Sequence, residues 1–174
     1  VTVFGRKSFN NRRRNAKDIG VLFGQKSHLW WDLPLIDSFN FLQKIYSKTS
    51  KQDMEWLKWL MSELEVDDYV DQPVRELSLG QRMRGEFICA LIHSPKLVIL
   101  DEPTKGIDVG AKAELYKLMV ELSKQGKTII MITSDMLELL SMSDRVMVMH
   151  EGYQVGIIPH TELTQERVLE LASG

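Results

Sequence analysis

Apolar residues recur along the chain with two spacings, and these spacings separate predicted strands from predicted helices. Unbroken apolar runs predict buried strands over residues 18–23, 97–100 and 127–133. Apolar positions three and four apart predict helices over residues 35–46, 50–64, 79–92, 110–125, 135–141 and 164–171. Two further runs flank Glu151-Gly152 and predict a β-hairpin over residues 145–149 and 153–158.

The order of these elements predicts the fold class. Strands that alternate with helices and have continuous apolar runs form a parallel sheet with helices packed over it, so we expect an α/β protein. The helical stretch at residues 26–93 separates two core strands and is predicted to be an inserted subdomain. The core would then comprise residues 1–25 and residues 94–174.

Composition narrows the class of protein without identifying it. The chain has 174 residues and a net charge of -2, which gives no global basic field for nucleic acid. No apolar run approaches the roughly 20 residues of a membrane-spanning helix. Cys89 is the single cysteine, which excludes an intramolecular disulfide, and its apolar neighbours predict a small core residue. We expect a cytoplasmic chain that reaches any membrane through a partner.

The first residues have two features of their own. Residues 1–5 alternate like a strand and lack an initiating methionine, so we expect a fragment of a longer protein. A basic loop at residues 6–17 contains Arg12-Arg13-Arg14. Such a patch can bind phosphate or nucleic acid, but its composition favours a solvated turn before the next strand.

Two carboxylates at the end of a predicted strand are the strongest candidates for chemistry. The apolar run at residues 97–100 leads into Asp101-Glu102, and Pro103-Thr104 follows. A strand-terminal aspartate can bind Mg²⁺ through oxygen, and the next glutamate can polarise the water that attacks a phosphate. The alternative is a solvated strand end that caps the next loop. The apolar run before the pair and the Pro-Thr after it favour phosphoryl transfer.

A second candidate lies about one predicted helix upstream, in Leu77-Ser78-Leu79-Gly80-Gln81. Ser78 offers a hydroxyl, and Gly80 lets the backbone approach a phosphate closely. The helix that follows would present its N-terminal N–H groups and its positive dipole end to an anion. A plain helix N-cap is the alternative, and the spacing to Asp101 favours the anion site.

Together, these segments resemble the ATPase subunits of ABC transporters. The resemblance implies a RecA-like P-loop NTPase core that here lacks its P-loop segment, with an inserted helical subdomain. It also implies ATP and Mg²⁺ bound at a dimer interface. In that arrangement Asp101 and Glu102 serve one ATP, while Ser78, Gly80 and Gln81 face the ATP held by a second ATPase subunit or domain.

The same resemblance assigns further residues. Gln25 stands where the family has its glutamine loop, so Gln25 and Asp101 are the expected metal ligands. Asp108 matches the loop that crosses the dimer interface, and it can equally be the N-cap of the next helix. The aromatic loop at residues 30–34 is either a contact for a membrane subunit or the cap of the helical subdomain.

The chain also departs from the family pattern. It contains no Gly-x-x-x-x-Gly-Lys-Ser/Thr sequence, which the family places upstream of the segment that starts here. Ser134-Asp135 stands where the family has its switch histidine, so a contact to the γ-phosphate is missing. Residues up to about 96 resemble exporter-type ATPases, whereas residues from 101 resemble the second ATPase half of sugar importers, which shares a serine and an acidic residue at that position. A recombined gene or an engineered chimera would explain the mixture.

The resemblance therefore predicts an ATP-hydrolysing subunit of an ABC transporter at the cytoplasmic face of the membrane. Its partners would be a transmembrane permease subunit and a second ATPase subunit or domain, with no nucleic acid. Glu102 would be the catalytic residue, and the isolated chain is expected to be inactive. The alternative is a non-catalytic module that completes the nucleotide site of another subunit. An ATPase acting on nucleic acid or ribosomes is disfavoured by the net charge.

Overall fold

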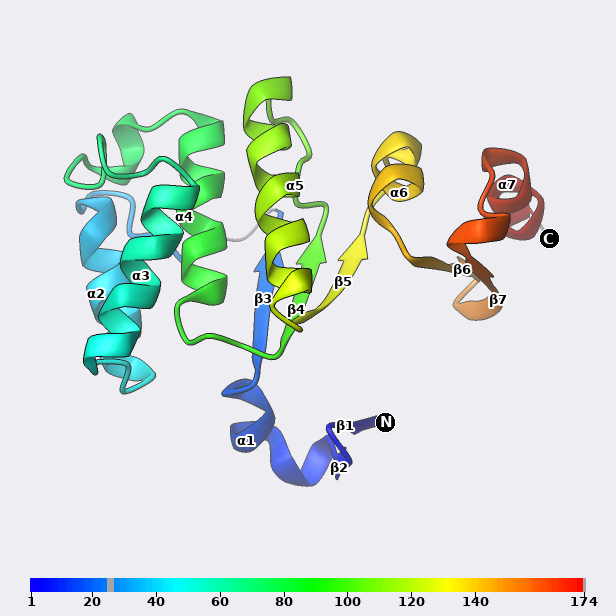
Figure 1. The fold of residues 1–174 in the computed structure, drawn as a ribbon, viewed down its shortest axis with the longest axis horizontal. Helices are drawn as coiled ribbons and strands as arrows, with labels where there is room; N and C mark the ends of the chain where they lie inside the picture. Colours follow the sequence, from blue (N-terminus) through cyan, green and yellow to red (C-terminus); the bar gives the residue numbers. More distant parts are fainter. Residues whose placement is uncertain (25–26, 174) are drawn as a thin grey trace. The chain divides into compact units, whose positions relative to one another are not determined.

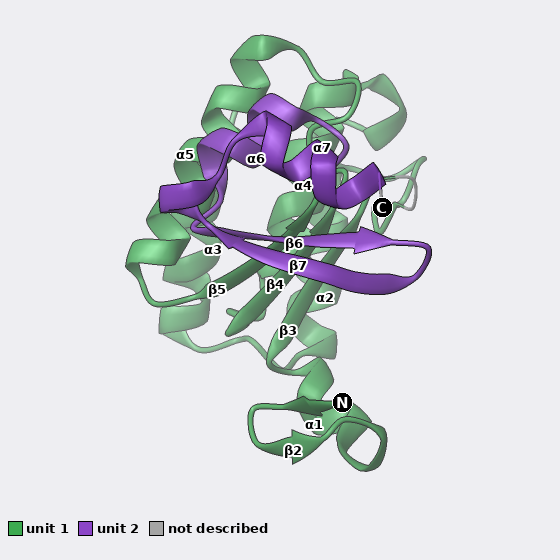
Figure 2. Cartoon of the chain, turned by 90° about the vertical axis from the view of Figure 1, so that its right-hand side faces the viewer, with its two compact units in different colours: residues 1–132 green, residues 133–174 purple. Residues whose placement is uncertain are grey.

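A computed structural model describes residues 1–24 and 27–173, which fall into two compact units. The first unit comprises residues 1–132 and the second residues 133–174 (Figure 1, Figure 2). The sequence-based division into residues 1–25, 26–93 and 94–174 stays a prediction.

The first unit contains most of the regular structure. Its strands are β1 (Thr2–Val3), β2 (Arg6–Lys7), β3 (Ile19–Phe23), β4 (Leu97–Asp101) and β5 (Thr128–Ile132). Its helices are α1 (Arg12–Ala16), α2 (Leu35–Ile45), α3 (Lys51–Glu63), α4 (Leu79–Leu91) and α5 (Val109–Lys124), with short 3-10 turns η1 (Phe9–Asn11) and η2 (Val74–Glu76). The second unit contains α6 (Met136–Met142), β6 (Arg145–His150), β7 (Tyr153–Pro159), η3 (His160–Glu162) and α7 (Gln165–Ser173).

The central sheet of the first unit is parallel, as predicted, and its strands lie in the order β3, β4, β5. Ile19, Leu97 and Thr128 are in register at one end. At the carboxyl end, Phe23 pairs with Asp101 and Asp101 with Ile132. The fold is therefore an α/β fold in which three strands end at one edge.

The two faces of this sheet differ in cover. Helix α4 contacts β3 and helix α5 contacts β5, and the side chains of Leu22, Val98 and Leu100 are each only 1% exposed. On the other face, Ile130 is 46% exposed and Ile132 is 52% exposed. The prediction that residues 127–133 form a buried strand is therefore wrong for one face of β5. An apolar run indicates that both faces of a strand would gain stability from burial, but it does not show which segments pack on each face.

Helices α2, α3 and α4 share a core, and Figure 1 shows them side by side. The fully buried side chains here are Leu35, Phe39, Leu60, Leu64, Phe87 and Ile88. The predicted N-cap of α3 is confirmed, because the Ser50 hydroxyl accepts the Asp53 N–H at 3.2 Å and Asp53 accepts the Ser50 N–H at 3.1 Å. Cys89 lies buried in α4, as predicted, and this burial raises the pKa of its thiol well above the usual value.

The basic segment at residues 6–17 is more ordered than predicted. It contains β2, η1 and α1, so its description as a loop is wrong. The guanidinium of Arg12 lies 4.8 Å from the centre of the Phe9 ring, while Arg13 and Arg14 are exposed. Short-range hydrogen bonds and cation–π contacts, which leave little trace in the apolar pattern, account for the difference.

The second unit is built on the predicted hairpin. Strands β6 and β7 pair in antiparallel fashion, with a register shift between Val148 and Met149. Glu151 and Gly152 form the turn with φ values of 47° and 84°. The core of this unit consists of Val146, Val148, Ile158 and Val168.

Candidate functional site

The carboxyl edge of the sheet holds the predicted catalytic pair. Strand β4 ends at Asp101, and Glu102 leaves the strand with a left-handed φ of 49°. The Glu102 N–H donates to the carbonyl of Ile132 at 2.8 Å, which fixes this turn to the end of β5. Both side chains are partly exposed, so they are accessible at the edge.

The end of β3 packs directly on this turn. The Gly24 N–H donates to the carbonyl of Asp101 at 2.9 Å. A Cβ atom at position 24 would lie 3.0 Å from the carbonyl oxygens of both Asp101 and Glu102, so glycine permits this close approach. Gln25, the predicted glutamine-loop residue, lies outside the described residues. Its neighbour Gly24 donates the hydrogen bond to Asp101, which is the residue predicted to bind the metal together with Gln25.

The loop after Glu102 is a compact turn that leads into α5. Pro103 and Thr104 are buried, and the Ile107 N–H donates to the carbonyl of Thr104 at 3.2 Å. Asp108 is the N-cap of α5, as the sequence allowed, because its carboxylate accepts the Ala111 N–H at 3.0 Å. That hydrogen bond lowers the pKa of the Asp108 carboxyl group below its ordinary value.

The second predicted group forms the start of α4. The Ser78 hydroxyl accepts the Gln81 N–H at 3.2 Å, and the Gln81 side chain accepts the Ser78 N–H at 2.9 Å. This capping box confirms the N-cap interpretation of Ser78. It does not exclude an anion, since a serine hydroxyl that accepts one hydrogen bond can still donate its own hydrogen.

The start of α4 lies against the loop that leads into α5. A Cβ atom on Gly80 would lie 3.3 Å from the Asp108 carboxylate and 3.4 Å from the Ala111 methyl group. Further along, Arg84 of α4 forms an ion pair with Glu114 of α5. The structure therefore brings Gly80, which follows the Ser78 cap, beside Asp108, while Asp101 and Glu102 lie with Gly24 at the edge of the sheet.

The fit of this edge to a metal ion can be judged from the ligands available. No group of three or more His, Cys, Asp or Glu side chains suited to a metal ion occurs in the described part of the chain. Magnesium commonly takes one or two carboxylates and fills its other positions with water and substrate phosphates. A single strand-end carboxylate such as Asp101 fits that kind of site.

The position predicted for the switch histidine lies in the second unit. The Asp135 carboxylate accepts the N–H groups of Leu137 at 3.0 Å and Glu138 at 3.2 Å, which makes it the N-cap of α6. Thr133 accepts the Asp135 N–H at 3.0 Å and donates to Glu138. These short-range bonds give Asp135 a structural role.

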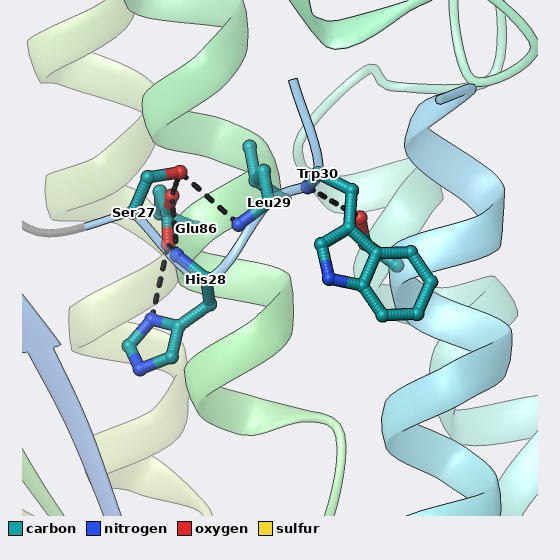
Figure 3. A network of polar contacts seen from close by, with 6 residues as sticks. Ser27, His28, Leu29, Trp30 and Glu86 are labelled. Atoms are coloured by element: carbon teal, nitrogen blue, oxygen red, sulfur yellow. Dashed lines mark hydrogen bonds and ion pairs between the residues drawn. The ribbon is translucent and has the colours of Figure 1, made fainter. Parts of the chain in front are cut away.

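Two links between residues 27–34, which include the aromatic loop, and α4 were missed by sequence analysis. Glu86 is 7% exposed and accepts hydrogen bonds from Ser27 and His28 (Figure 3). The guanidinium of Arg82 lies 5.1 Å from the centre of the Trp31 ring. The available signal was a carboxylate at the start of the apolar run Phe87-Ile-Cys-Ala in α4, since a buried charge needs partners.

Across residues 1–24 and 27–173, no helix is both long enough and apolar enough to cross a lipid bilayer.

Comparison with known proteins identifies relatives over most of the chain. The family model described as ABC transporter matches residues 2–105. A putative ribose/galactose/methyl galactoside import ATP-binding protein of Geobacillus kaustophilus is 50% identical over 105 residues, which are 60% of this chain and 21% of that protein. The ribose import ATP-binding protein RbsA of Oceanobacillus iheyensis is 42% identical over 161 residues, which are 92% of this chain and 32% of that protein. The chain thus spans about a fifth to a third of these relatives.

Solved structures share the fold. The structure of cbiO1 from Clostridium perfringens, part of the ABC transporter complex cbiONQ, superimposes with a TM-score of 0.80 at 25% identity. That match covers 97% of this chain and 68% of cbiO1. An ATP binding subunit of an ABC transporter gives a TM-score of 0.83 at 18% identity, over 99% of this chain and 71% of that subunit.

Proposed function

Because the chain belongs to the ABC transporter family, we propose that it contributes part of an ATP-hydrolysing site to a transporter. The family match over residues 2–105 includes Asp101 and Glu102 and the segment from Ser78 to Gln81. The observation that supports the proposal most is the packing of Gly24 on the Asp101-Glu102 turn. It gathers the ends of β3, β4 and β5 at the edge where parallel sheets bind ligands.

Asp101 and Glu102 have separate roles in this proposal. Asp101, with Gln25, would hold Mg²⁺ beside the phosphates of ATP. When bound, the ion would neutralise charge on the phosphate oxygens. Glu102 would accept a proton from the attacking water, which makes it the catalytic residue. Its bond to the carbonyl of Ile132 and the buried Pro103 hold its backbone in place.

Ser78, Gly80 and Gln81 would face the ATP of a second ATPase subunit or domain. Their support is geometric, because the capped N-terminus of α4 presents backbone N–H groups beside Gly80. Asp108 lies against Gly80, so a shift of one motif at the interface would move the other. A homodimer and a heterodimer both satisfy this arrangement.

A membrane permease would complete the transporter, with this chain peripheral at the cytoplasmic face. An open groove of about 560 Å³ beside the aromatic loop is lined by Trp30, Leu33, Phe41 and Met54, among others, and could receive such a partner. The relatives named for ribose and galactose import suggest a sugar as the transported solute. The exporter-like character of the first half stays a prediction, and those names do not support it.

The catalytic assignment is tested by Glu102→Gln in the transporter assembled at its native length. We expect ATP hydrolysis to fall about 100-fold or more while ATP still binds, because the amide cannot accept the proton of the attacking water. Glu55→Gln, at an exposed position of α3, is the matched control and should hydrolyse ATP normally. Wild-type turnover by Glu102→Gln would reject the assignment.

A non-catalytic role is the second candidate. The capping role of Asp135, where the family has its switch histidine, favours it. In this case the chain would complete the nucleotide site of another subunit and hydrolyse nothing itself. An intact-mass measurement on the native polypeptide, compared with the 20.1 kDa of this chain, shows whether a P-loop segment is attached. Measurable Mg-ATP hydrolysis by the purified native protein would exclude the non-catalytic role.

A further inference from the structure

A buried carboxylate in the middle of α4 holds the segment that follows Gln25. Both oxygens of Glu86 accept the His28 N–H, each at 3.0 Å, and Oε1 also accepts the Ser27 hydroxyl. The Nδ1 atom of His28 lies 3.1 Å from Oε2. The Ser27 oxygen accepts the Leu29 N–H at 3.1 Å, so one carboxylate organises three consecutive residues (Figure 3).

Apolar packing strengthens the same link. Leu29 is only 7% exposed, and a Cβ atom on Gly85 would lie 3.3 Å from its side chain and 2.8 Å from that of Leu35. Position 85 therefore needs a glycine so that Leu29 and Leu35 can rest on the backbone of α4. Ser27 and His28 themselves are exposed, so the buried carboxylate of Glu86 is the group that holds this exposed segment to α4.

The other half of the loop is fixed to the residues just before Ser78. The Arg75 N–H donates to the carbonyl of Trp31 at 2.9 Å, and the Val74 N–H donates to that of Leu33 at 3.1 Å. Arg82, on the first turns of α4, lies over the Trp31 ring. Residues 27–34 are thus attached both to α4 and to the residues just before Ser78.

We propose that Glu86 is a positioning residue that makes the segment after Gln25 move together with α4. The inference rests on the proposed function, because it concerns the same ATP sites. Glu86 lies about two helical turns after Ser78 on the same helix, so a displacement of the segment from Ser78 to Gln81 would be passed through its carboxylate to residues 27–29. Residues 27–34, which would face the permease, and helix α4, which would face ATP, would then move together.

The chemistry of the anchor requires a carboxylate. Two oxygens without hydrogens accept bonds from Ser27 and His28 together. In Glu86→Gln one oxygen is replaced by an NH₂ group, which is a donor and would face donors. The near-identical shape leaves the helix and the packing of Leu29 unchanged, so the variant separates the hydrogen bonds from the fold.

Hydrogen exchange on the protein at its native length tests the anchor without ATP. In Glu86→Gln we expect the His28 amide to exchange about tenfold faster, with amides of β4 unchanged as a check of folding. Ser27→Ala, a loop-side variant, should accelerate His28 in the same direction and by less. Ser38→Ala is the matched control, because it removes the bond from the Trp30 N–H at 3.2 Å in the same loop without touching α4. Unchanged exchange at His28 in Glu86→Gln would overturn the proposal.

Transport by the assembled, reconstituted transporter tests the consequence. In Glu86→Gln we expect the amount of solute moved per ATP hydrolysed to fall roughly fivefold, with ATP affinity unchanged, while Ser38→Ala keeps the wild-type ratio. A ratio unchanged in Glu86→Gln, or lost equally in Ser38→Ala, contradicts a positioning role. Failure of the proposed function would appear instead as wild-type turnover in Glu102→Gln, and the exchange of His28 would still decide whether Glu86 is the anchor.

Discussion

Individual side chains at the two motifs combine a local structural bond with the chemistry proposed for them. Ser78 and Asp108 each cap the helix that follows. Ser78 stands just before Gly80 in the sequence, and the carboxylate of Asp108 lies against Gly80 in the structure. A helix start has several N–H groups without helical partners, so a serine that caps one of them leaves others for the anion that we propose. The capping bond observed at Ser78 is therefore compatible with the proposed anion site.

His93 leads to a prediction at the scale of a single residue. Its ring stacks on Tyr46 at 4.2 Å, and Nε2 lies 3.0 Å from the carbonyl of Ile19. Burial lowers the pKa of His93, with further lowering from the charges of Lys48 and Lys127 and an opposing effect of the Ile19 carbonyl and Asp18.

Because the folded state disfavours the charged imidazole, the unfolded state takes up the proton first on acidification. The stability contributed by neutral His93 is therefore complete above the ordinary value of 6.5 and is lost as the pH falls below it. We expect His93→Phe, which keeps the stacking, to have a smaller loss of unfolding free energy between about pH 7 and pH 5. Urea denaturation at each pH measures this. Asp18 does not confound the window, since its pKa is lowered from 3.8 by the hydrogen bond from Arg6.

At the scale of helices and strands, local signals predicted the bounds well. The helices α3 and α4 begin where Ser50 and Ser78 stand three residues before Asp53 and Gln81, and both pairs form capping boxes. Such a signal is complete within four residues, so it can be read from the chain alone. The partners of Glu86 could not be predicted in this way, because Ser27 and His28 are nearly sixty positions away along the chain, at separations of 59 and 58.

Whether a side chain of a helix or strand is buried depends on segments that are distant in the sequence, and this dependence gives a second prediction. Ile88 in α4 is fully buried, whereas Ile130 in β5 is 46% exposed. We expect Ile88→Ala to lower the unfolding free energy by about 2–5 kcal/mol, because it leaves a cavity in the packed interior around α4. Ile130→Ala is its matched control and should cost clearly less, as measured by chemical denaturation. Equal losses would contradict the assignment of Ile130 to an exposed face.

At the scale of the whole molecule, the two units differ in the size of their cores. In the described part of the second unit, the buried apolar core consists of Val146, Val148, Ile158 and Val168, whereas many more apolar side chains are buried in the helices and the sheet of the first unit. Small cores give low local stability. We expect amides of β6 and β7 to exchange at least about tenfold faster than those of β4 in hydrogen exchange followed by mass spectrometry. Equal protection across both units would show that they unfold as one.

Sequence reasoning at this scale reached the family and the α/β class but not the complete site. The order of Ser78, Gly80, Asp101, Glu102 and Asp108 is visible in the chain, and the family match over residues 2–105 covers the first four. The closeness of Gly24 to Glu102 and of Gly80 to Asp108 follows from strand register and helix packing, which sequence spacing alone does not encode. In the proposed site, residues of a second ATPase subunit or domain would also contribute, and this sequence alone cannot identify them.

The burial of Cys89 has a practical consequence for labelling chemistry. Thiol reagents attack the thiolate at an accessible sulfur, whereas the Cys89 thiol is buried in α4 and its pKa is raised well above the usual value. Within this chain, Cys89 is therefore expected to be unreactive toward maleimides under native conditions. A cysteine introduced at an exposed position, such as Trp31 or Val109, would be the reactive thiol of the chain, so fluorescent or spin probes can be attached there without redesigning the core.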